Sequence, residues 1–447
     1  MKNKNTAFHQ NFHFVWSRIR TQPIVWDTIT TTGWGTIGKG VGFLVPFFIA
    51  AWFGVTSETD AFFFAYGLIL FFSSVFAPIA ENMIVPYIAE IREKGEDVGR
   101  FVGRILCISG MGLTTLVGVT LLIIKPVLSV ITHFDGQSLN LVYWLFVETA
   151  PLIVLLIWTS VLAGSLNAYK NFAFPAISPA FRAIFNIGII FTLKDALGVH
   201  AIALGYVAGE LVRFAILFMI IKIQKLFKLS LALNLTHKIR EFLKVSFYRM
   251  VALGAAVFNP IIDKTMATWL GEGNVSVLYY ANIIYVIPVS FLSAGLFPVV
   301  LSHWSSSYYN SKDKQLLFEK ANKTFWVTFL ISFAVTGIFV LLSKPLVYLA
   351  LGRGEFNPVH LSKVQRVFIY YILGLAPYIA GSMFTRAHLI LKRTKFLMIL
   401  AFLNCFLNVV LNYIFMQFAG VAGIALSTSV TVLIIAGLLF IATRPKT

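Results

Sequence analysis

"TSETDAFFFAYGLILFF", residues 56–72, places two carboxylates, Glu58 and Asp60, directly before a run of phenylalanine and leucine. The run is apolar enough to enter a lipid bilayer as part of a spanning helix. A charge close to hydrocarbon is costly unless it reaches water, pairs with another group or serves a transport pathway. The stretch therefore predicts a membrane helix with an acid at its entrance, and the rest of the chain must show what that acid serves.

The composition is that of a polytopic membrane protein. Of the 447 residues, 58% are hydrophobic and 12% charged, and the mean hydropathy is +0.83, whereas soluble proteins have about 25% charged residues. The formal net charge of +18 comes from short basic clusters between apolar runs, which is typical of topology signals, so we expect no nucleic-acid partner. Both cysteines, Cys107 and Cys405, lie inside apolar runs, so neither a disulfide framework nor a cysteine metal motif is indicated.

Spanning about 30 Å of hydrocarbon takes about 20 helical residues. Segments that meet this requirement occur at 33–53, 62–86, 101–124, 141–164, 174–193, 199–221, 245–270, 275–302, 324–343, 365–385, 396–416 and 419–442. They lack the ten-residue alternation of a barrel strand. We therefore predict an all-α polytopic membrane protein with about twelve transmembrane helices.

The distribution of lysine and arginine predicts the orientation. If the N-terminus is cytoplasmic, 25 of the 36 basic residues lie in cytoplasmic segments, six in outer loops and five within helices, as the positive-inside rule requires. Both termini are then cytoplasmic. Four of the six outer residues, Lys344, Arg353, Lys363 and Arg366, share one loop, which is either a surface that meets something anionic or a solvated loop with a few charges.

An internal repeat divides the chain. "KNFAFPAISPAFRAIFNIGIIFTLKDALGVHAIAL" from Lys170 aligns without gaps to "KRTKFLMILAFLNCFLNVVLNYIFMQFAGVAGIAL" from Lys392, at an offset of 222. The two share polar and glycine positions, among them Asn186 with Asn408. Repeated halves around a central site are typical of secondary transporters. We predict a cytoplasmic arm at 1–32 and a first six-helix bundle at 33–221. A basic cytoplasmic linker at 222–244 leads to a second six-helix bundle at 245–442, and a short cytoplasmic tail follows at 443–447.

Several motifs resemble the MurJ/MviN lipid II flippases of the multidrug/oligosaccharidyl-lipid/polysaccharide exporter superfamily. They are "SETDAFFFAY", "AGSLNAYKNFAFPAISPAF", "NPIIDKTMATWLGEGNVSVLYYANIIYVIPVSFLSAGLFPVVLS" and "LGRGEFN", in this order over nearly the whole chain. The resemblance implies a flippase of the bacterial inner membrane, not an enzyme, that moves an undecaprenyl-pyrophosphate-linked saccharide to the outer leaflet by alternating access. It implies partners among membrane lipids and cell-wall or polysaccharide synthesis enzymes.

The sequence departs from this family where cavity arginines are expected. Val45, Ser73 and Ile283 stand at some of those positions, and Val286 replaces a family glutamate. Lys39 replaces an arginine and keeps the charge without bidentate phosphate recognition. Either the substrate is a different polyprenyl-linked glycan or the cavity has relocated its cations.

The remaining cations within helices are the candidate substrate-binding residues, each with a structural alternative: Lys39, Arg182, Arg249 and Lys264. Lys39 binds substrate or reaches the membrane interface, and Arg249 binds substrate or anchors the interface. Arg182 either faces the cleft or pairs with an acid such as Glu81 or Glu148. Arg213, three residues after Glu210, is predicted to form a structural pair with it.

In sodium-coupled members of the family, an aspartate of the seventh helix and polar residues of the eleventh helix hold the ion. The corresponding segments here are 245–270 and 396–416. Here Asp263, Asn404 and Asn408 would supply oxygen ligands of the kind a hard cation prefers. Asn408 stands where the family has a carboxylate, and asparagine pairs also serve as contacts between membrane helices. Sodium is therefore a candidate coupling ion, and no other cofactor is expected.

Asp60 is predicted to be an outer-gate residue that pairs with a cation or a helix N-terminus while the cleft faces inward. The alternative is a local cap with Thr59, and Glu58 is expected to be solvated. The other functional classes left open are an exopolysaccharide or O-antigen unit flippase, a cation-coupled exporter of small amphiphiles, and a membrane glycan enzyme. The last would need a large outer loop or an acidic cluster, which the sequence lacks.

Overall fold

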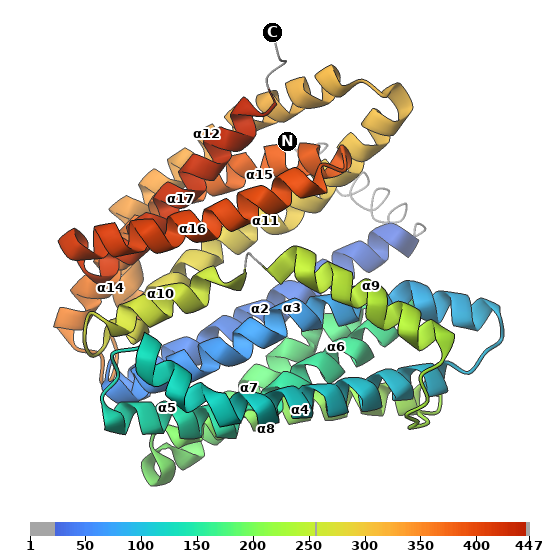
Figure 1. The fold of residues 1–447 in the computed structure, drawn as a ribbon, viewed down its shortest axis with the longest axis horizontal. Coiled ribbons are helices and arrows are strands. Elements are labelled where there is room, and N and C mark those ends of the chain that lie inside the picture. Colours follow the sequence, from blue (N-terminus) through green and yellow to red (C-terminus); the bar gives the residue numbers. More distant parts are fainter. Residues whose placement is uncertain (1–22, 255–256, 444–447) are drawn as a thin grey trace, which may run out of the picture.

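The structure is a computed structural model that describes residues 23–254 and 257–443, and every regular element in these ranges is a helix (Figure 1). The first helices are α2 (Pro23–Phe53), α3 (Ser57–Glu93), α4 (Val98–Ile131), α5 (Gly136–Thr149), α6 (Pro151–Ala168), α7 (Ala173–Leu197) and α8 (His200–Ile223). The later ones are α9 (His237–Gly254), α10 (Asn259–Thr268), α11 (Asn274–Ser311), α12 (Lys314–Leu341), α13 (Ser343–Leu351), α14 (Pro358–Leu373), α15 (Leu375–Ile390), α16 (Thr394–Ala419) and α17 (Val421–Ile441). The predicted all-α class is confirmed.

The helices form two lobes. In the N lobe, α2 to α8, the closest packing is between α7 and α8, α3 and α6, and α2 and α7. In the C lobe, α10 to α17, it is between α12 and α15 and between α16 and α17. The lobes meet where α2 and α3 contact α10, α11 and α13, and Figure 1 shows them converging at the left and diverging to the right.

Eleven helical segments of the described chain are long and apolar enough to cross a membrane, against twelve predicted. The difference lies at 245–270, which the structure divides between α9 and α10. Pro260 stands in the first turn of α10, where its missing N–H is tolerated, although it could not continue an earlier helix. The ten-residue α10 is about 15 Å long, half of a bilayer core.

The phenylalanines after Asp60 face protein and not lipid. Phe62, Phe63 and Phe64 are fully buried because α5, α6, α10 and α11 all pack against α3. The helix that opens with the acid is therefore central to the fold, and it contacts both lobes.

The backbone confirms the internal repeat. Lys170 and Lys392 both have left-handed backbone conformations, with φ of 59° and 55°. Gly198 and Gly420, which end α7 and α16, have φ/ψ of 54°/−136° and 57°/−137°, a region that favours glycine. Matching helices of the two lobes thus begin after, and end at, the same unusual conformations, 222 residues apart.

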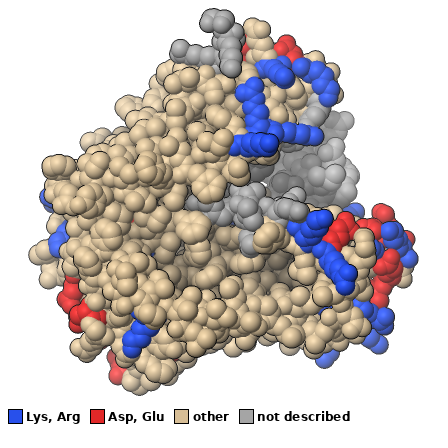
Figure 2. All heavy atoms as spheres, viewed as in Figure 1, with Lys and Arg blue, Asp and Glu red and all other residues tan. Residues whose placement is uncertain are grey.

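Charge separates the two ends of the molecule. Because consecutive spans alternate in direction, the loops after α3, α6, α8, α11 and α15 lie at one end, and Figure 2 shows lysine and arginine gathered there on both lobes, at the right. We call this the basic end. The opposite end, where the lobes contact each other, is the closed end.

Candidate functional site

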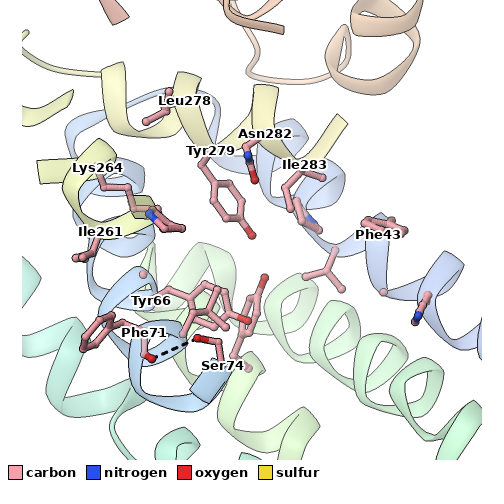
Figure 3. A pocket seen from close by; sticks show the side chains of 18 of the residues that line it. Phe43, Tyr66, Phe71, Ser74, Ile261, Lys264, Leu278, Tyr279, Asn282 and Ile283 are labelled. Carbon is pink, nitrogen blue, oxygen red and sulfur yellow. Dashed lines mark hydrogen bonds between the residues drawn. The ribbon is translucent and has the colours of Figure 1, made fainter. Parts of the chain in front are cut away.

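A cavity of about 790 Å³ lies between the lobes (Figure 3). Helices α2, α3, α7 and α8 line it from the N lobe, and α10, α11, α14 and α17 line it from the C lobe. Its volume falls within the range of about 300–1,000 Å³ that is usual for ligand sites. A site shared by two lobes changes shape whenever the lobes move relative to each other.

Lys39 reaches the cavity from α2 and is also exposed, so the cavity meets the surface beside it. The flanking glycines differ in their surroundings. A Cβ on Gly38 would lie 2.5 Å from the carbonyl oxygen of Ala176, so this glycine permits α2 and α7 to approach closely. A Cβ on Gly42, which also lines the cavity, would meet nothing within 4 Å.

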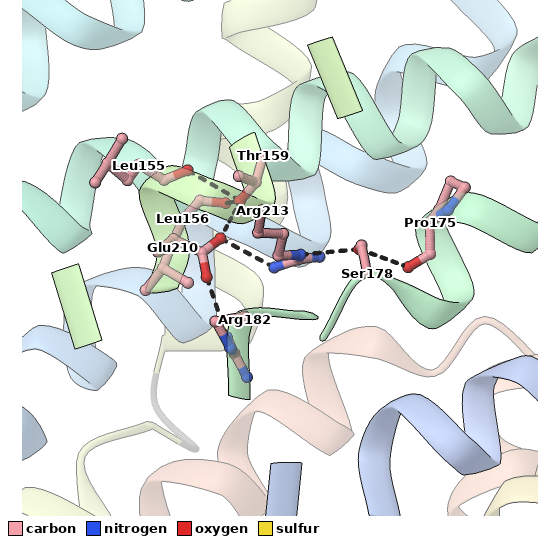
Figure 4. A network of polar contacts seen from close by, with 8 residues as sticks. All are labelled: Leu155, Leu156, Thr159, Pro175, Ser178, Arg182, Glu210 and Arg213. Atoms are coloured by element: carbon pink, nitrogen blue, oxygen red, sulfur yellow. Dashed lines mark hydrogen bonds and ion pairs between the residues drawn. The ribbon is translucent and has the colours of Figure 1, made fainter. Parts of the chain in front are cut away.

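Arg182 lines the cavity and at the same time pairs with an acid (Figure 4). Its Nη1 lies 3.3 Å from the Glu210 carboxylate, and 32% of its side chain remains exposed. The prediction that Arg182 pairs with Glu81 or Glu148 is therefore wrong. Glu148 instead contacts His200 at 2.8 Å, and Glu81 lies 3.5 Å from the amide of Asn167.

Glu210 has no exposed surface and is fully enclosed by donors. It accepts hydrogen bonds from the Thr159 hydroxyl at 2.6 Å and from Arg213 Nη1 at 3.1 Å, besides that from Arg182. Arg213 Nε donates to the Ser178 hydroxyl at 3.0 Å, so the predicted Glu210–Arg213 pair is confirmed and extended. Two guanidinium groups contact this one carboxylate, and both arginines line the cavity, where Arg182 is the more exposed.

Lys264 crosses from α10 to the N lobe. Its Nζ donates to the backbone carbonyl of Phe63 at 2.8 Å and lies 5.3 Å from the ring centre of Tyr279. Gly67 makes room for it, since a Cβ there would lie 2.6 Å from Nζ. The lysine thus lines the cavity and joins the two lobes.

Three tyrosines add hydroxyl groups to the wall beside these cations. The rings of Tyr66 and Tyr206 lie 4.6 Å apart, and the hydroxyls of Tyr206 and Tyr279 interact across the lobes. Figure 3 shows the Tyr279 hydroxyl pointing into the cavity toward the side of Tyr66. Tyr66 and Tyr279 lie within the quoted motifs and Tyr206 does not, but nothing in the sequence alone showed that the three hydroxyl groups share one wall.

Asp263 points into the C lobe, toward α16 and α17. Its Oδ1 accepts a hydrogen bond from the Asn412 amide at 2.7 Å, and Asn408 and Thr428 also face the carboxylate. Asn404 lies elsewhere, because its Oδ1 accepts from Asn259 at 2.5 Å. The structure thus groups Asp263 with Asn408 but not with Asn404.

Asn412 is the residue that sequence reasoning missed at this site, although it continues the same four-residue spacing beyond Asn404 and Asn408. Its buried Oδ1 has no hydrogen-bond partner in the described part of the chain. Carboxylate, amide and hydroxyl oxygens around one point are ligands that suit a hard cation. No cluster of three histidine, cysteine or acidic residues occurs within 23–254 and 257–443.

Asp60 lies at the closed end and caps a helix of the other lobe. Its carboxylate accepts hydrogen bonds from the backbone N–H of Gly273 at 2.6 Å, the N–H of Ser276 at 2.7 Å and the Ser276 hydroxyl at 2.6 Å. These groups form the N-terminus of α11, where a negative charge is favourable. Thr56, in a capping box with Thr59, caps α3 itself.

Four more contacts close the same end. Tyr280 donates its hydroxyl to the carbonyl of Gly54 at 3.2 Å, and the N–H of Glu355 donates to the carbonyl of Ala51 at 3.0 Å. The Trp269 indole donates to the carbonyl of Ile131 at 2.8 Å, and the N–H of His133 donates to the Thr268 hydroxyl at 3.2 Å. All of them join the N lobe to the C lobe. Glu58 is exposed, as predicted.

The positions that depart from the family pattern have different locations. Val45 and Ile283 line the cavity, whereas Ser73 is buried and donates to the carbonyl of Ile69 at 2.7 Å. Arg249 belongs to α9, but its side chain lies outside the described part of the structure.

Two helical lobes around a charged cavity that is closed at one end define a multi-pass membrane transporter. The chain belongs to the MurJ family, because the family model described as lipid II flippase MurJ matches residues 49–447. The resemblance drawn from the motifs is thereby confirmed.

Named relatives resemble the chain in sequence, and solved structures resemble it in fold. The chain is 25% identical over 410 residues to a Thermotoga maritima protein named probable lipid II flippase MurJ, covering 91% of this chain and 82% of that one. It is 24% identical over 433 residues to lipid II flippase MurJ of Burkholderia cenocepacia, covering 94% and 83%. The fold resembles a lipid II flippase MurJ in an inward closed conformation, with a TM-score of 0.77 and 23% identity over 94% of this chain and 87% of that one. It also resembles an inward-facing multidrug transporter of the MATE family, with a TM-score of 0.76 and 14% identity over 93% and 97%.

Proposed function

We propose that this protein is a flippase that moves lipid II from the cytoplasmic to the outer leaflet of the bacterial inner membrane. Lipid II is a polyprenyl-pyrophosphate-linked saccharide and a peptidoglycan precursor. Membership of the MurJ family and the names of its relatives support this substrate. The reaction is transport by alternating access and involves no covalent chemistry. Its product would supply the enzymes that polymerise the cell wall.

The positive-inside rule supports the orientation. The basic end would face the cytoplasm, together with both termini, and the closed end would face outward. In this orientation the contacts that join the lobes lie at the outer end, which supports entry of substrate from the inside.

The observation that carries the proposal is the set of cations that line one cavity from both lobes: Lys39, Arg182 and Arg213 from the N lobe and Lys264 from the C lobe. A pyrophosphate cannot cross hydrocarbon without such groups, since an isolated charge costs many kcal/mol there. The guanidinium of Arg182 supplies donors in a planar fork that fits phosphate oxygens. The cavity thus has cations even though Val45 and Ile283 replace family arginines.

Closure at the outer end supports alternating access. Asp60 and Ser276 would separate when the lobes part at this end, and the Lys264–Phe63 contact would separate with them. The freed Lys264 ammonium could then follow the phosphate, because it has three donors and uses one on the carbonyl. The polyprenyl tail would stay in lipid beside the protein.

Sodium coupling is a further part of the proposal. Asp263, Asn408, Asn412 and Thr428 would hold the ion between α10, α16 and α17. The buried Oδ1 of Asn412, which has no protein partner among the described residues, supports this ligand set. Binding there would draw α10, which carries Lys264, toward the C lobe.

Reconstitution tests the proposed function. Proteoliposomes that contain lipid II are treated with an impermeant enzyme that modifies its sugar, so that only lipid in the accessible leaflet reacts. We expect the wild type to make nearly all lipid II reactive, while vesicles with the Lys39→Ala, Arg182→Ala double variant stop at the fraction that faced out initially. An exporter of small amphiphiles would leave that fraction unchanged in both preparations.

A further inference from the structure

Four basic residues at the closed end have no role in the cavity. Lys344 lies in α13, Arg353 follows it, Lys363 and Arg366 lie in α14, and all four are exposed. In the ranges that the structure describes, none of them takes part in an ion pair. Four exposed cations, with Glu355 as the one acid in the same segment, form a surface that can attract an anion.

Arg353 differs from the other three because it lines a second cavity, of about 490 Å³. Every other residue that lines this groove is apolar. Leu44, Phe48 and Ala51 of α2 form one wall, and α11, α12 and α13 form the other. The groove therefore combines one cation with a hydrocarbon surface, which is the chemistry of an anionic lipid.

The groove runs along the membrane-spanning part of α2 and away from the cation. Leu44 and Ala51 are seven residues apart, which corresponds to about 10 Å of helix. Leu44 is 45% and Leu349 is 66% exposed, so the groove opens toward the bilayer. A hydrocarbon chain that follows α2 would thus place its headgroup near Arg353.

Helix α13 places Arg353 at the level of lipid headgroups. Val347 and Leu351 are buried, whereas Tyr348 and Leu349 are 65% and 66% exposed. A short helix that exposes a tyrosine and a leucine beside membrane-spanning helices is typical of a membrane interface. The guanidinium that follows this helix can donate two parallel hydrogen bonds to phosphate oxygens.

The groove exists only while the lobes are joined at the closed end. Its walls belong to different lobes, and next to it the N–H of Glu355 donates to the carbonyl of Ala51. Gly354 is needed at this point, since a Cβ there would lie 2.0 Å from the Ala51 oxygen, and its φ is 61°. An occupant of the groove would therefore stabilise the closed arrangement, because a ligand favours the state that it fits.

We propose that this groove binds one anionic phospholipid of the leaflet at the closed end, with its phosphate on Arg353 and a chain against α2 and α11. The bound lipid stabilises the arrangement in which that end is shut. The site is separate from the central cavity, so lipid binding there is independent of the substrate that the central cavity carries.

Native mass spectrometry of the full chain in a neutral detergent, with added phosphatidylglycerol, tests this site. The wild type is expected to retain one phosphatidylglycerol more than Arg353→Gln. The matched control Lys363→Gln, an exposed cation outside the groove, should retain the same number as the wild type. Ala350→Trp, which fills the groove and leaves Arg353 in place, should lose the lipid as well.

A second measurement connects the lipid to closure. Phosphatidylglycerol should slow the labelling of a cysteine at Val275, a buried position beside Asp60, by an impermeant maleimide in the wild type but not in Arg353→Gln. Phosphatidylcholine and inorganic phosphate should not slow it. Equal lipid retention by wild type, Arg353→Gln and Ala350→Trp would show only a general lipid coat, and protection by phosphate alone would show an anion site without a lipid. Either result would overturn the proposal.

Discussion

The Asp60 carboxylate accepts hydrogen bonds from both the backbone N–H and the hydroxyl of Ser276, at 2.7 and 2.6 Å, although the two residues belong to different lobes. The aspartate is 2% exposed, so water contributes little to its solvation. Its charge is instead stabilised by the N-terminus of α11. This interaction can form only while the lobes are joined at the closed end.

Asp60→Asn should loosen the closed end. The substitution replaces a buried carboxylate by an amide whose NH₂ group faces donors, and a hydrogen bond to a charged group is worth about 1.5–3 kcal/mol. We therefore expect a cysteine at Val275 to be labelled by an impermeant maleimide about tenfold faster or more. Asp60→Ala should abolish transport while the protein still inserts normally.

Glu58→Gln is the matched control for this prediction, because Glu58 is exposed two residues away and its carboxylate makes no hydrogen bond in the described structure. It should leave both labelling and transport at the wild-type level. Wild-type labelling in Asp60→Asn together with full transport in Asp60→Ala would remove Asp60 from the gate.

Gly67→Ala should displace Lys264 from its contact with Phe63. The new Cβ would lie 2.6 Å from Nζ, and the flexible lysine can move away, so the hydrogen bond between the lobes is lost while the helix is retained. We expect a lower Tm and slower transport. In a Lys264→Ala background the same glycine substitution should have no further effect on Tm, because every side-chain atom that it displaces is already gone.

Gly40→Ala provides the comparison, since a Cβ at Gly40 would meet nothing within 4 Å. Equal decreases in Tm for Gly67→Ala with and without Lys264 would mean that the glycine is required by the backbone alone.

Arg213 should contribute mainly to the stability of the fold, and Arg182 mainly to transport. Arg213 has a side chain that is 12% exposed and bonds to both Glu210 and Ser178, so Arg213→Ala leaves a buried carboxylate short of donors and should destabilise the fold by about 3–5 kcal/mol. Arg182→Ala leaves Arg213 and Thr159 in place around Glu210. It should abolish lipid II movement with a much smaller decrease in Tm.

Measurement of Tm and transport on the same preparations separates these roles. If Arg182→Ala loses stability as severely as Arg213→Ala, the whole network is structural and Arg182 is not a binding residue.

Sodium should stabilise the protein through Asp263. A ligand at a hundred times its Kd raises the free energy of unfolding by about 2.7 kcal/mol, so Tm should rise in sodium relative to choline. Asp263→Ala and Asn412→Ala should both abolish the rise. Asn404→Ala should keep it, because Asn404 contacts Asn259 and not the carboxylate. Equal Tm values in sodium and choline for the wild type would eliminate the proposed ion site.

Local features of the fold could be predicted from sequence because they depend on nearby residues. Gly198 and Gly420 mark equivalent helix ends, and their backbone conformations agree within a few degrees. The split of the predicted 245–270 span could not be read from hydropathy, since Pro260 stops a helix without lowering the apolar content of the segment.

The site was only partly predictable because its contacts join distant segments. Asp60 was recognised as a gate candidate, but its partner Ser276 is 216 positions away, and only the packing of α3 on α11 brings them together. The partner of Arg182 was predicted wrongly, because the spacing of residues along the sequence does not determine the rotation of α8 about its axis. That rotation points Glu210 toward α7. The asparagine series was placed one turn too early, at Asn404 and Asn408 instead of Asn408 and Asn412, because residues four apart share a helix face and spacing does not fix the level at which α10 crosses α16.

The most direct test of the central claim is mass spectrometry of undecaprenyl-linked lipids after depletion of this protein in its own host, with an impermeant label to report the leaflet of each species. Lipid II should accumulate, and the accumulated lipid should stay on the cytoplasmic side, out of reach of the label. Accumulation of a different lipid-linked glycan, or of lipid II that the label reaches, would contradict this claim.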